Sequence, residues 1–124
     1  MVEPVHGVMA QVRRRTLGLV EHLDEERLNA VFTPIMSPLA WDLGHVAAYE
    51  DLWINHRTAG RELLREDLAA LYDAFETPRS VRGEIEFLRG GELRAYMAAV
   101  RERALEAPVG EYHELVIRHE LQHT

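Results

Sequence analysis

The chain has 124 residues, 47% of them hydrophobic and 28% charged, which is the composition of one globular domain and excludes a largely disordered protein. Its formal net charge is −7, with 14 Lys and Arg against 21 Asp and Glu, and this balance disfavours a nucleic-acid-binding surface. The absence of cysteine excludes disulfides, thiolate metal sites and a cysteine nucleophile, and it agrees with a cytoplasmic location.

The N-terminal part of the chain has the residue spacing of an amphipathic helix. Pro4 suits a first helical turn, and the apolar stripe alternates steps of four and three residues through Val5, Met9, Val12, Thr16, Leu19 and Leu23. Arg13, Arg14 and Arg15 form the only basic run, which we interpret as a solvated face of this helix. Residues 24–36 lose the stripe and are expected to form a connection.

A serine and a proline at residues 37–38 predict the start of a second helix, because these residues favour the N-cap and the first turn. This helix is expected to run to about Arg57 and to end at residues 58–60. Apolar residues at helical spacing predict a shorter helix within residues 61–75. Residues 76–91 contain a proline and three glycines, which predict mostly irregular structure.

Two further helices are predicted in the C-terminal part of the chain. One carries Leu93, Tyr96, Met97, Val100 and Ala104 on one side, and the last runs from about Val109 to Thr124. No segment alternates as a strand does, so the predicted fold is an all-α four-helix bundle, a single domain over residues 1–124 with a long crossover between the second and third helices. There is no signal-peptide pattern and no apolar run approaching the ~18 residues of a membrane span, so we expect no membrane partner.

Two histidines stand one helical turn apart in the last predicted helix. On a helical wheel His119 and His123 fall on its apolar stripe, with Tyr112, Leu115, Val116 and Gln122. Glu114, Arg118 and Glu120 point elsewhere, and Glu120 is interpreted as a surface charge, with a supporting contact to a metal ligand as the alternative. The histidine pair is either hydrogen-bonded in the core or chelates a metal, because two buried imidazoles each need a partner.

A third histidine occupies the same kind of position in the second predicted helix. His45 shares its face with Trp41, Ala48, Tyr49 and Leu52. Three inward histidines on two helices are the minimum for a first-row metal site with open coordination positions, and nitrogen ligands suit Zn(II), Fe(II), Cu(II) or Ni(II). The stretch HELQH also fits the HExxH pattern of zinc proteases, a moderate signal when it stands alone. His6, His22, His56 and His113 are interpreted as structural or solvated residues.

Two separated motifs, SPLAWDLGHVAAYEDLW and RHELQHT, resemble the N-terminal DinB-like domain of the ergothioneine-biosynthesis sulfoxide synthases (EgtB). The region between them is also similar, in ALYDAFETPRSVRGEIEFL and YMAAVRERALE, so the resemblance covers residues 36–124. It implies a DinB-like four-helix bundle and a mononuclear non-haem Fe(II) held by His45, His119 and His123. In that family, iron and O2 join the sulfur of a small-molecule thiol, γ-glutamylcysteine or cysteine, to trimethylated histidine (hercynine), giving a sulfoxide.

Members of that family continue into a second domain, related to formylglycine-generating enzyme, which supplies most of the substrate pocket and a catalytic tyrosine. Nothing in this sequence matches that domain, so we expect the chain to be a fragment that is inactive alone, and we assign no catalytic residue within it. Two alternatives stay open. The chain could be a DinB-like thiol S-transferase that uses Zn(II) or Ni(II), or a non-catalytic helical interaction domain whose histidines bind no metal.

Overall fold

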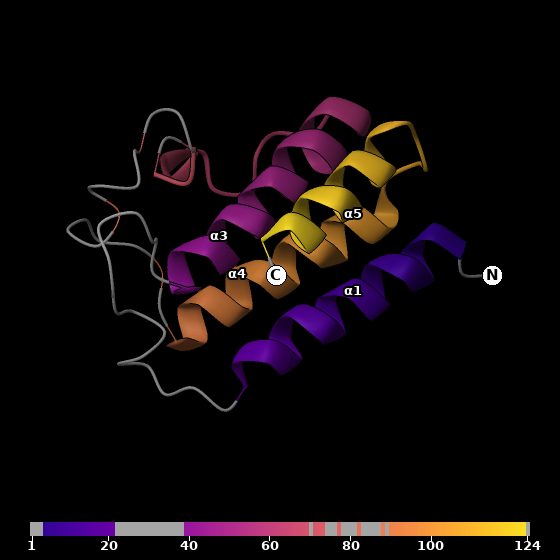
Figure 1. Ribbon diagram of the computed structural model, residues 1–124. Coiled ribbons are helices and arrows are strands. Elements are labelled where there is room, and N and C mark those ends of the chain that lie inside the picture. Colours follow the sequence, from indigo (N-terminus) through magenta and orange to yellow (C-terminus); the bar gives the residue numbers. More distant parts are fainter. Residues whose placement is uncertain are drawn as a thin grey trace.

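The computed structural model describes residues 4–21, 39–69, 71–73, 77, 82, 88 and 90–123, and all regular structure among them is helical. Four α-helices lie along one another as a bundle (Figure 1): α1 (Pro4–Val20), α3 (Leu39–Glu50), α4 (Gly90–Glu106) and α5 (Tyr112–Gln122). The all-α four-helix prediction is therefore confirmed. The predicted connection at 24–36 and the predicted helix start at 37–38 lie outside the described residues. Within the described ranges, no helix has both the length and the apolar character needed to cross a bilayer.

The helices pack in two pairs that share a core. α3 lies against α4, α1 lies against α5, and α5 also contacts α3 (Figure 1). One apolar cluster is built around the fully buried Trp41 of α3 and Val100 of α4. A second cluster, around Met9 of α1, includes Val116 of α5. The predicted apolar stripes of α1 and α5 therefore face each other, and α5 contacts both α1 and α3.

The second predicted helix changes its type before it ends. Beyond Glu50 the chain continues as a π-helix, η1 (Asp51–Thr58), in place of the α-helix that we expected to reach Arg57. The buried side chain of Asn55 donates to Asp51 Oδ1 (2.8 Å) and to the carbonyl oxygen of Val100 (3.3 Å), which ties this wider turn to α4. Gly60 has a φ of 72°, so the chain leaves the helix through the left-handed conformation that glycine favours.

The predicted helix over residues 61–75 is wrong. In the described part of this segment the only helical element is a single 3₁₀ turn, η2 (Glu66–Leu68). Side chains of α3 and η1 occupy the backbone groups that a helix would use: Asp51 Oδ2 accepts from the amide of Leu64 (2.8 Å), and Trp41 Nε1 donates to the carbonyl of Leu71 (3.0 Å). The leucines still face the core, but the backbone that carries them is irregular.

Candidate metal centre

Three histidines from two helices come together on one side of the bundle. One ring nitrogen from each of His45, His119 and His123 lies within 4.8 Å of the other two. His45 comes from α3, His119 from the last turn of α5, and His123 caps that helix. Among the described residues, these three form the only group of three or more histidine or acidic side chains close enough to hold an ion. We call them the histidine cluster.

The ring of His45 is oriented by a backbone carbonyl. Its Nδ1–H donates to the carbonyl oxygen of Tyr72 at 2.6 Å, and because a carbonyl can only accept, the proton of the neutral ring lies on Nδ1. The Nε2 lone pair is therefore free to face the cluster, where it lies 2.9 Å from His119 Nε2. Without a metal, His119 Nε2–H must donate to His45 Nε2, which leaves His119 Nδ1 unprotonated.

That Nδ1 atom is buried and has no hydrogen-bond partner. Burial lowers the pKa of His119 to about 3, with the neighbouring His45 and His123 adding to the effect. Burial also lowers the pKa of His45, against the opposing hydrogen bond to Tyr72. Both rings are consequently neutral near pH 7, which is the form of histidine that binds metals.

Aromatic neighbours fix the planes of two cluster rings. Tyr49 stacks on His119 with ring centroids 3.6 Å apart and an interplanar angle of 7°, and Trp41 stacks on His45 at 4.9 Å and 12°. Trp41 and Tyr49 precede and follow His45 by four residues on the same helix face, which is where the sequence placed them. The rings thus have little freedom to turn away from one another.

The donor set and its spacing fit a first-row transition metal. Two nitrogens bound at a right angle, each about 2.1 Å from an ion, are separated by about 3 Å. The Nε2 atoms of His45 and His119 lie 2.9 Å apart, so an ion could take the place of the proton between them. Asp42 Oδ1 lies 3.7 Å from His123 Nδ1, near the position that a carboxylate partner takes beside a ligating imidazole.

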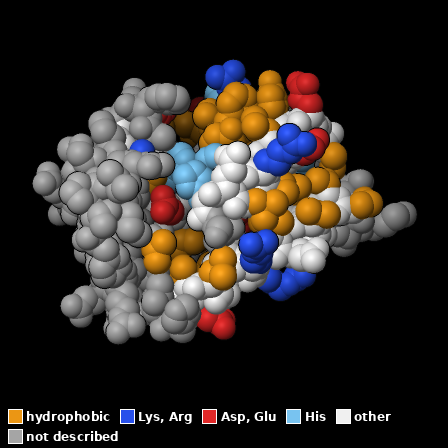
Figure 2. Space-filling model, in the orientation of Figure 1, with side chains coloured by type: hydrophobic (Ala, Val, Ile, Leu, Met, Phe, Trp, Pro, Cys, Tyr) orange, Lys and Arg blue, Asp and Glu red, His pale blue; other side chains and the backbone are white. Residues whose placement is uncertain are grey.

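The cluster is accessible from the outside. His45 is buried and the other two rings are half-buried, and histidine side chains are visible at the surface in the view of Figure 2. A pocket of about 230 Å³ borders His123 and Asp42, with apolar walls from α1 and α3: Leu19, Val20, Leu39, Leu43 and Val46. A small molecule could therefore approach the cluster along an apolar surface.

Residues 9–124 match the DinB superfamily. The chain belongs to this superfamily. Its relatives include proteins named hercynine oxygenase from Mycolicibacterium smegmatis (40% identical over 98% of this chain), Mycobacterium tuberculosis (39% over 93%) and Mycolicibacterium thermoresistibile (38% over 80%). These matches confirm the resemblance seen in the two histidine motifs. This DinB-like chain spans 30%, 29% and 22% of the lengths of those relatives.

The DinB-like bundle also contains buried charges that the sequence analysis placed in solvent. Arg13 is buried, although its neighbours in the basic run, Arg14 and Arg15, are exposed as predicted. Glu120, interpreted as a surface charge, is only 2% exposed and accepts from Arg13 Nε at 3.1 Å. Both interpretations were wrong because a helical wheel marks the apolar face and cannot show an opposite charge on another helix.

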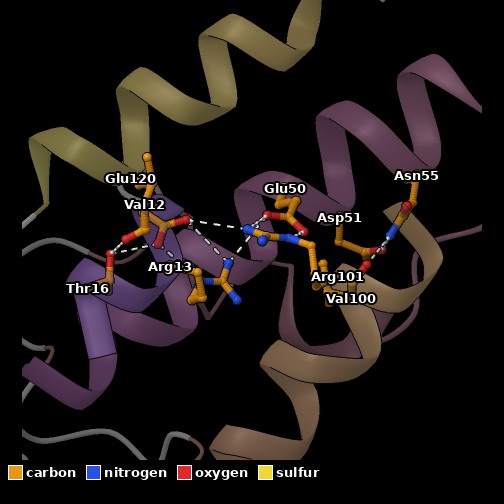
Figure 3. A network of polar contacts seen from close by, with 9 residues as sticks. All are labelled: Val12, Arg13, Thr16, Glu50, Asp51, Asn55, Val100, Arg101 and Glu120. Carbon is orange, nitrogen blue, oxygen red and sulfur yellow. Dashed lines mark hydrogen bonds and ion pairs between the residues drawn. The ribbon is translucent and has the colours of Figure 1, made fainter. Parts of the chain in front are cut away.

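We call this set the buried charge network; it consists of Arg13 of α1, Glu50 of α3, Arg101 of α4 and Glu120 of α5 (Figure 3). Arg101 donates to both oxygens of Glu50, each at 3.0 Å, and Arg13 Nη2 reaches Glu50 Oε1 at 3.3 Å. Two arginines balance two carboxylates, so the buried charges compensate one another. The sequence analysis missed Glu50 and Arg101 entirely.

The remaining histidines lie away from the cluster. His113 was interpreted as structural, and it is 2% exposed in contact with the half-buried His6, with ring centroids 6.2 Å apart. The Nε2 atoms of both rings are buried without a hydrogen-bond partner, so His6, which was expected to meet solvent, does so only in part. His56 is exposed, and its Nδ1 donates to the carbonyl of Arg61 at 2.9 Å. His22 lies outside the described residues.

Proposed function

We propose that this chain is the metal-binding helical domain of a longer iron- and O2-dependent enzyme that joins a thiol sulfur to hercynine as a sulfoxide. The support is the identity of 38–40% to relatives named hercynine oxygenase, together with three histidines arranged to share an ion. The thiol is a small molecule, γ-glutamylcysteine or cysteine. The rest of the enzyme is a domain related to formylglycine-generating enzyme, which supplies the catalytic residues.

The convergence of His45, His119 and His123 carries this proposal. Their nitrogens come from helices that are far apart in the sequence, and burial of three imidazoles has a free-energy cost unless something binds them. Two of the rings have lowered pKa values, so they are in the neutral form that binds metals. A metal ion would give one ring nitrogen of each histidine a common partner, which hydrogen bonds within the described residues do not.

The chain's own residues have distinct roles in such a centre. His45, His119 and His123 would hold the ion, and bound there Fe(II) would supply the redox chemistry that a reaction with O2 needs. The Tyr72 carbonyl keeps the His45 Nδ1 proton away from the cluster, and Tyr49 holds the plane of His119. Three imidazoles would leave coordination positions of an ion open, so such a centre would have room for the reactants.

A metal titration and a turnover assay together test this proposal. The 124-residue chain should bind one Fe(II) or Co(II) ion under anaerobic conditions, and His119→Ala should lose that binding while its circular dichroism spectrum stays helical. The longer enzyme, loaded with Fe(II), should consume O2 only when hercynine and a thiol are both present. The chain alone should show no more than trace turnover.

Two results would contradict the proposal in different ways. Turnover with Zn(II) and no O2 would indicate the thiol S-transferase function, because zinc has no redox chemistry. If the parent chain bound neither Fe(II) nor Co(II), the result would instead favour the alternative of a non-catalytic helical interaction domain. Hercynine turnover by the 124-residue chain at the rate of the longer enzyme would refute the role assigned to the second domain.

A further inference from the structure

The buried charge network connects the two helices that carry the histidine cluster. Glu50 ends α3, the helix of His45, and Glu120 directly follows His119 on α5. Their arginine partners come from α1 and α4, helices that contribute nothing to the cluster (Figure 3). Each ligand-bearing helix therefore supplies a carboxylate, and each of the other two supplies a guanidinium.

Glu120 is held more firmly than an ordinary helical glutamate. Its Oε2 accepts from Thr16 Oγ1 at 2.6 Å and from Arg13 Nε at 3.1 Å, and its Oε1 accepts from Arg13 Nη2 at 3.3 Å. Arg101 Nη2 lies 3.7 Å from Oε1 on the other side. A buried carboxylate that lost these donors would carry an uncompensated charge, so the network strongly disfavours any movement of Glu120.

The position of Glu120 on α5 couples this anchor to the cluster. Adjacent residues of an α-helix point about 100° apart, so Glu120 faces α1 while His119 faces α3. A rotation of α5 that turned His119 away from His45 would also pull Glu120 out of its contacts with Arg13 and Thr16. α5 has only 11 residues, and a helix of that length needs tertiary contacts to hold its orientation.

We propose that Glu120 and Arg13 are positioning residues for the histidine cluster, which set the rotation of α5 and thereby the metal affinity of His119 and His123. This inference rests on the proposed metal-binding function. It assigns α1 a part in the metal centre even though α1 provides no ligand. It also gives the glutamate of HELQH a role different from that of a general base, because its side chain points away from the cluster.

The test compares matched variants of the 124-residue chain by Co(II) titration, followed by visible absorption under anaerobic conditions. Glu120→Gln is paired with Glu114→Gln, since Glu114 is exposed on the same helix, and Arg13→Met is paired with Arg14→Met. The two network variants should bind Co(II) about tenfold or more weakly, with a changed absorption band, and the two controls should match the parent. If Glu120→Gln fails to fold, Thr16→Val removes the shortest contact and leaves both guanidiniums.

Further measurements distinguish a positioning effect on the histidine cluster from a general loss of stability. They also distinguish it from a chain that binds no metal at all. Leu93→Ala, buried in α4 outside the network, should lower the unfolding midpoint without weakening Co(II) binding in the folded state. In the metal-free chain, nuclear Overhauser contacts between the rings of Tyr49 and His119 should weaken in Glu120→Gln and persist in Glu114→Gln.

A parent that binds no metal would refute the proposed function, while the ring contacts would still decide the positioning role. Two results would overturn the inference. In one, Glu120→Gln and Arg13→Met fold and keep both the Co(II) affinity and the ring contacts of the parent. In the other, Leu93→Ala loses as much Co(II) affinity as the network variants do.

Discussion

Tyr72 lies directly against Gly44, in the space that a β-carbon on residue 44 would fill. The ring can reach α3 there only because the helix has no side chain at that point. The close approach also brings the Tyr72 carbonyl to His45, the next residue, whose Nδ1–H it accepts at 2.6 Å. The glycine therefore acts on the histidine cluster through Tyr72.

Replacement of Gly44 should destabilise the protein in spite of the higher helix propensity of alanine. We expect Gly44→Ala to lower the free energy of unfolding by about 1–3 kcal/mol, because the new methyl group overlaps a buried ring that must shift. Urea denaturation followed by circular dichroism measures the change.

A glycine-to-alanine replacement at an uncrowded position of α1 provides a control. Gly18 lies in α1 with nothing near its missing β-carbon, so Gly18→Ala should raise the free energy of unfolding by about 0.5–1 kcal/mol. An increase in both variants would show that Tyr72 does not occupy this space in solution.

The metal-free chain should change little in stability when His119 is replaced. His119→Leu eliminates a buried ring nitrogen without a partner, but it also removes the N–H that donates to His45 Nε2, so the free energy of unfolding should stay within about 1 kcal/mol of the parent value in the presence of a chelator. At a metal concentration 100 times the dissociation constant, the parent should gain about 2.7 kcal/mol and the variant nothing. Thermal unfolding with and without Co(II) measures both effects. A variant that is less stable than the parent by more than about 1 kcal/mol in the chelator would mean that the Tyr49 stack and the hydrogen bond to His45 together outweigh the unpaired nitrogen.

Alkaline pH should weaken the fold through two buried tyrosines. Burial raises the pKa of Tyr72 to about 12, and it raises the pKa of Tyr96 as well. An unfolded tyrosine has a pKa of about 10, so the folded chain binds more protons above that pH. The stabilisation is complete below about pH 10 and is lost as the pH rises from there toward 12, by up to about 1.4 kcal/mol per pH unit for each tyrosine.

Unfolding in urea at pH 9, 10 and 11 tests this dependence. The chain has neither lysine nor cysteine, so tyrosines are the main side chains that titrate in this range, and burial raises the pKa of Tyr49 as well. Tyr96→Phe should reduce the slope, because it removes one of the two phenols. An unchanged slope in that variant would show that Tyr96 ionises normally in the folded state.

Buried and exposed arginines should differ sharply in their effect on stability. Arg101→Ala leaves Glu50 buried with a single arginine partner, and it should cost about 3–5 kcal/mol. Arg118 pairs with Glu114 on the exposed face of α5, and Arg118→Ala should change the free energy of unfolding by no more than about 0.5 kcal/mol. Chemical denaturation of the two variants gives the comparison. Similar losses would mean that the network is hydrated and flexible in solution.

The parts of the fold that follow from local spacing were predictable. Leu93, Val100 and their neighbours mark α4 through the period of their apolar side chains, and the same period placed His45 and His119 on inward faces. The resemblance of the two motifs then identified the superfamily. What the sequence could not indicate was a partner on another helix, as for Arg13 and Glu120, or a backbone group taken by a distant side chain, as for Leu71.

The π-helix after α3 has a consequence for how the chain can tolerate insertions and deletions. A single-residue deletion inside α3 ahead of His45 would turn the residues on one side of it by about 100° relative to the other, separating Trp41 from the ring it covers. The wide turns of η1 contain one residue more than an α-helix needs, and π-helical turns of this kind occur as bulges within α-helices. A deletion at His56 or Arg57 could therefore be absorbed by tightening η1 into an α-helix, with His45 and Glu50 left in register. The stretch just after the segment that carries His45 is where the length of this helix can change without cost to the histidine cluster.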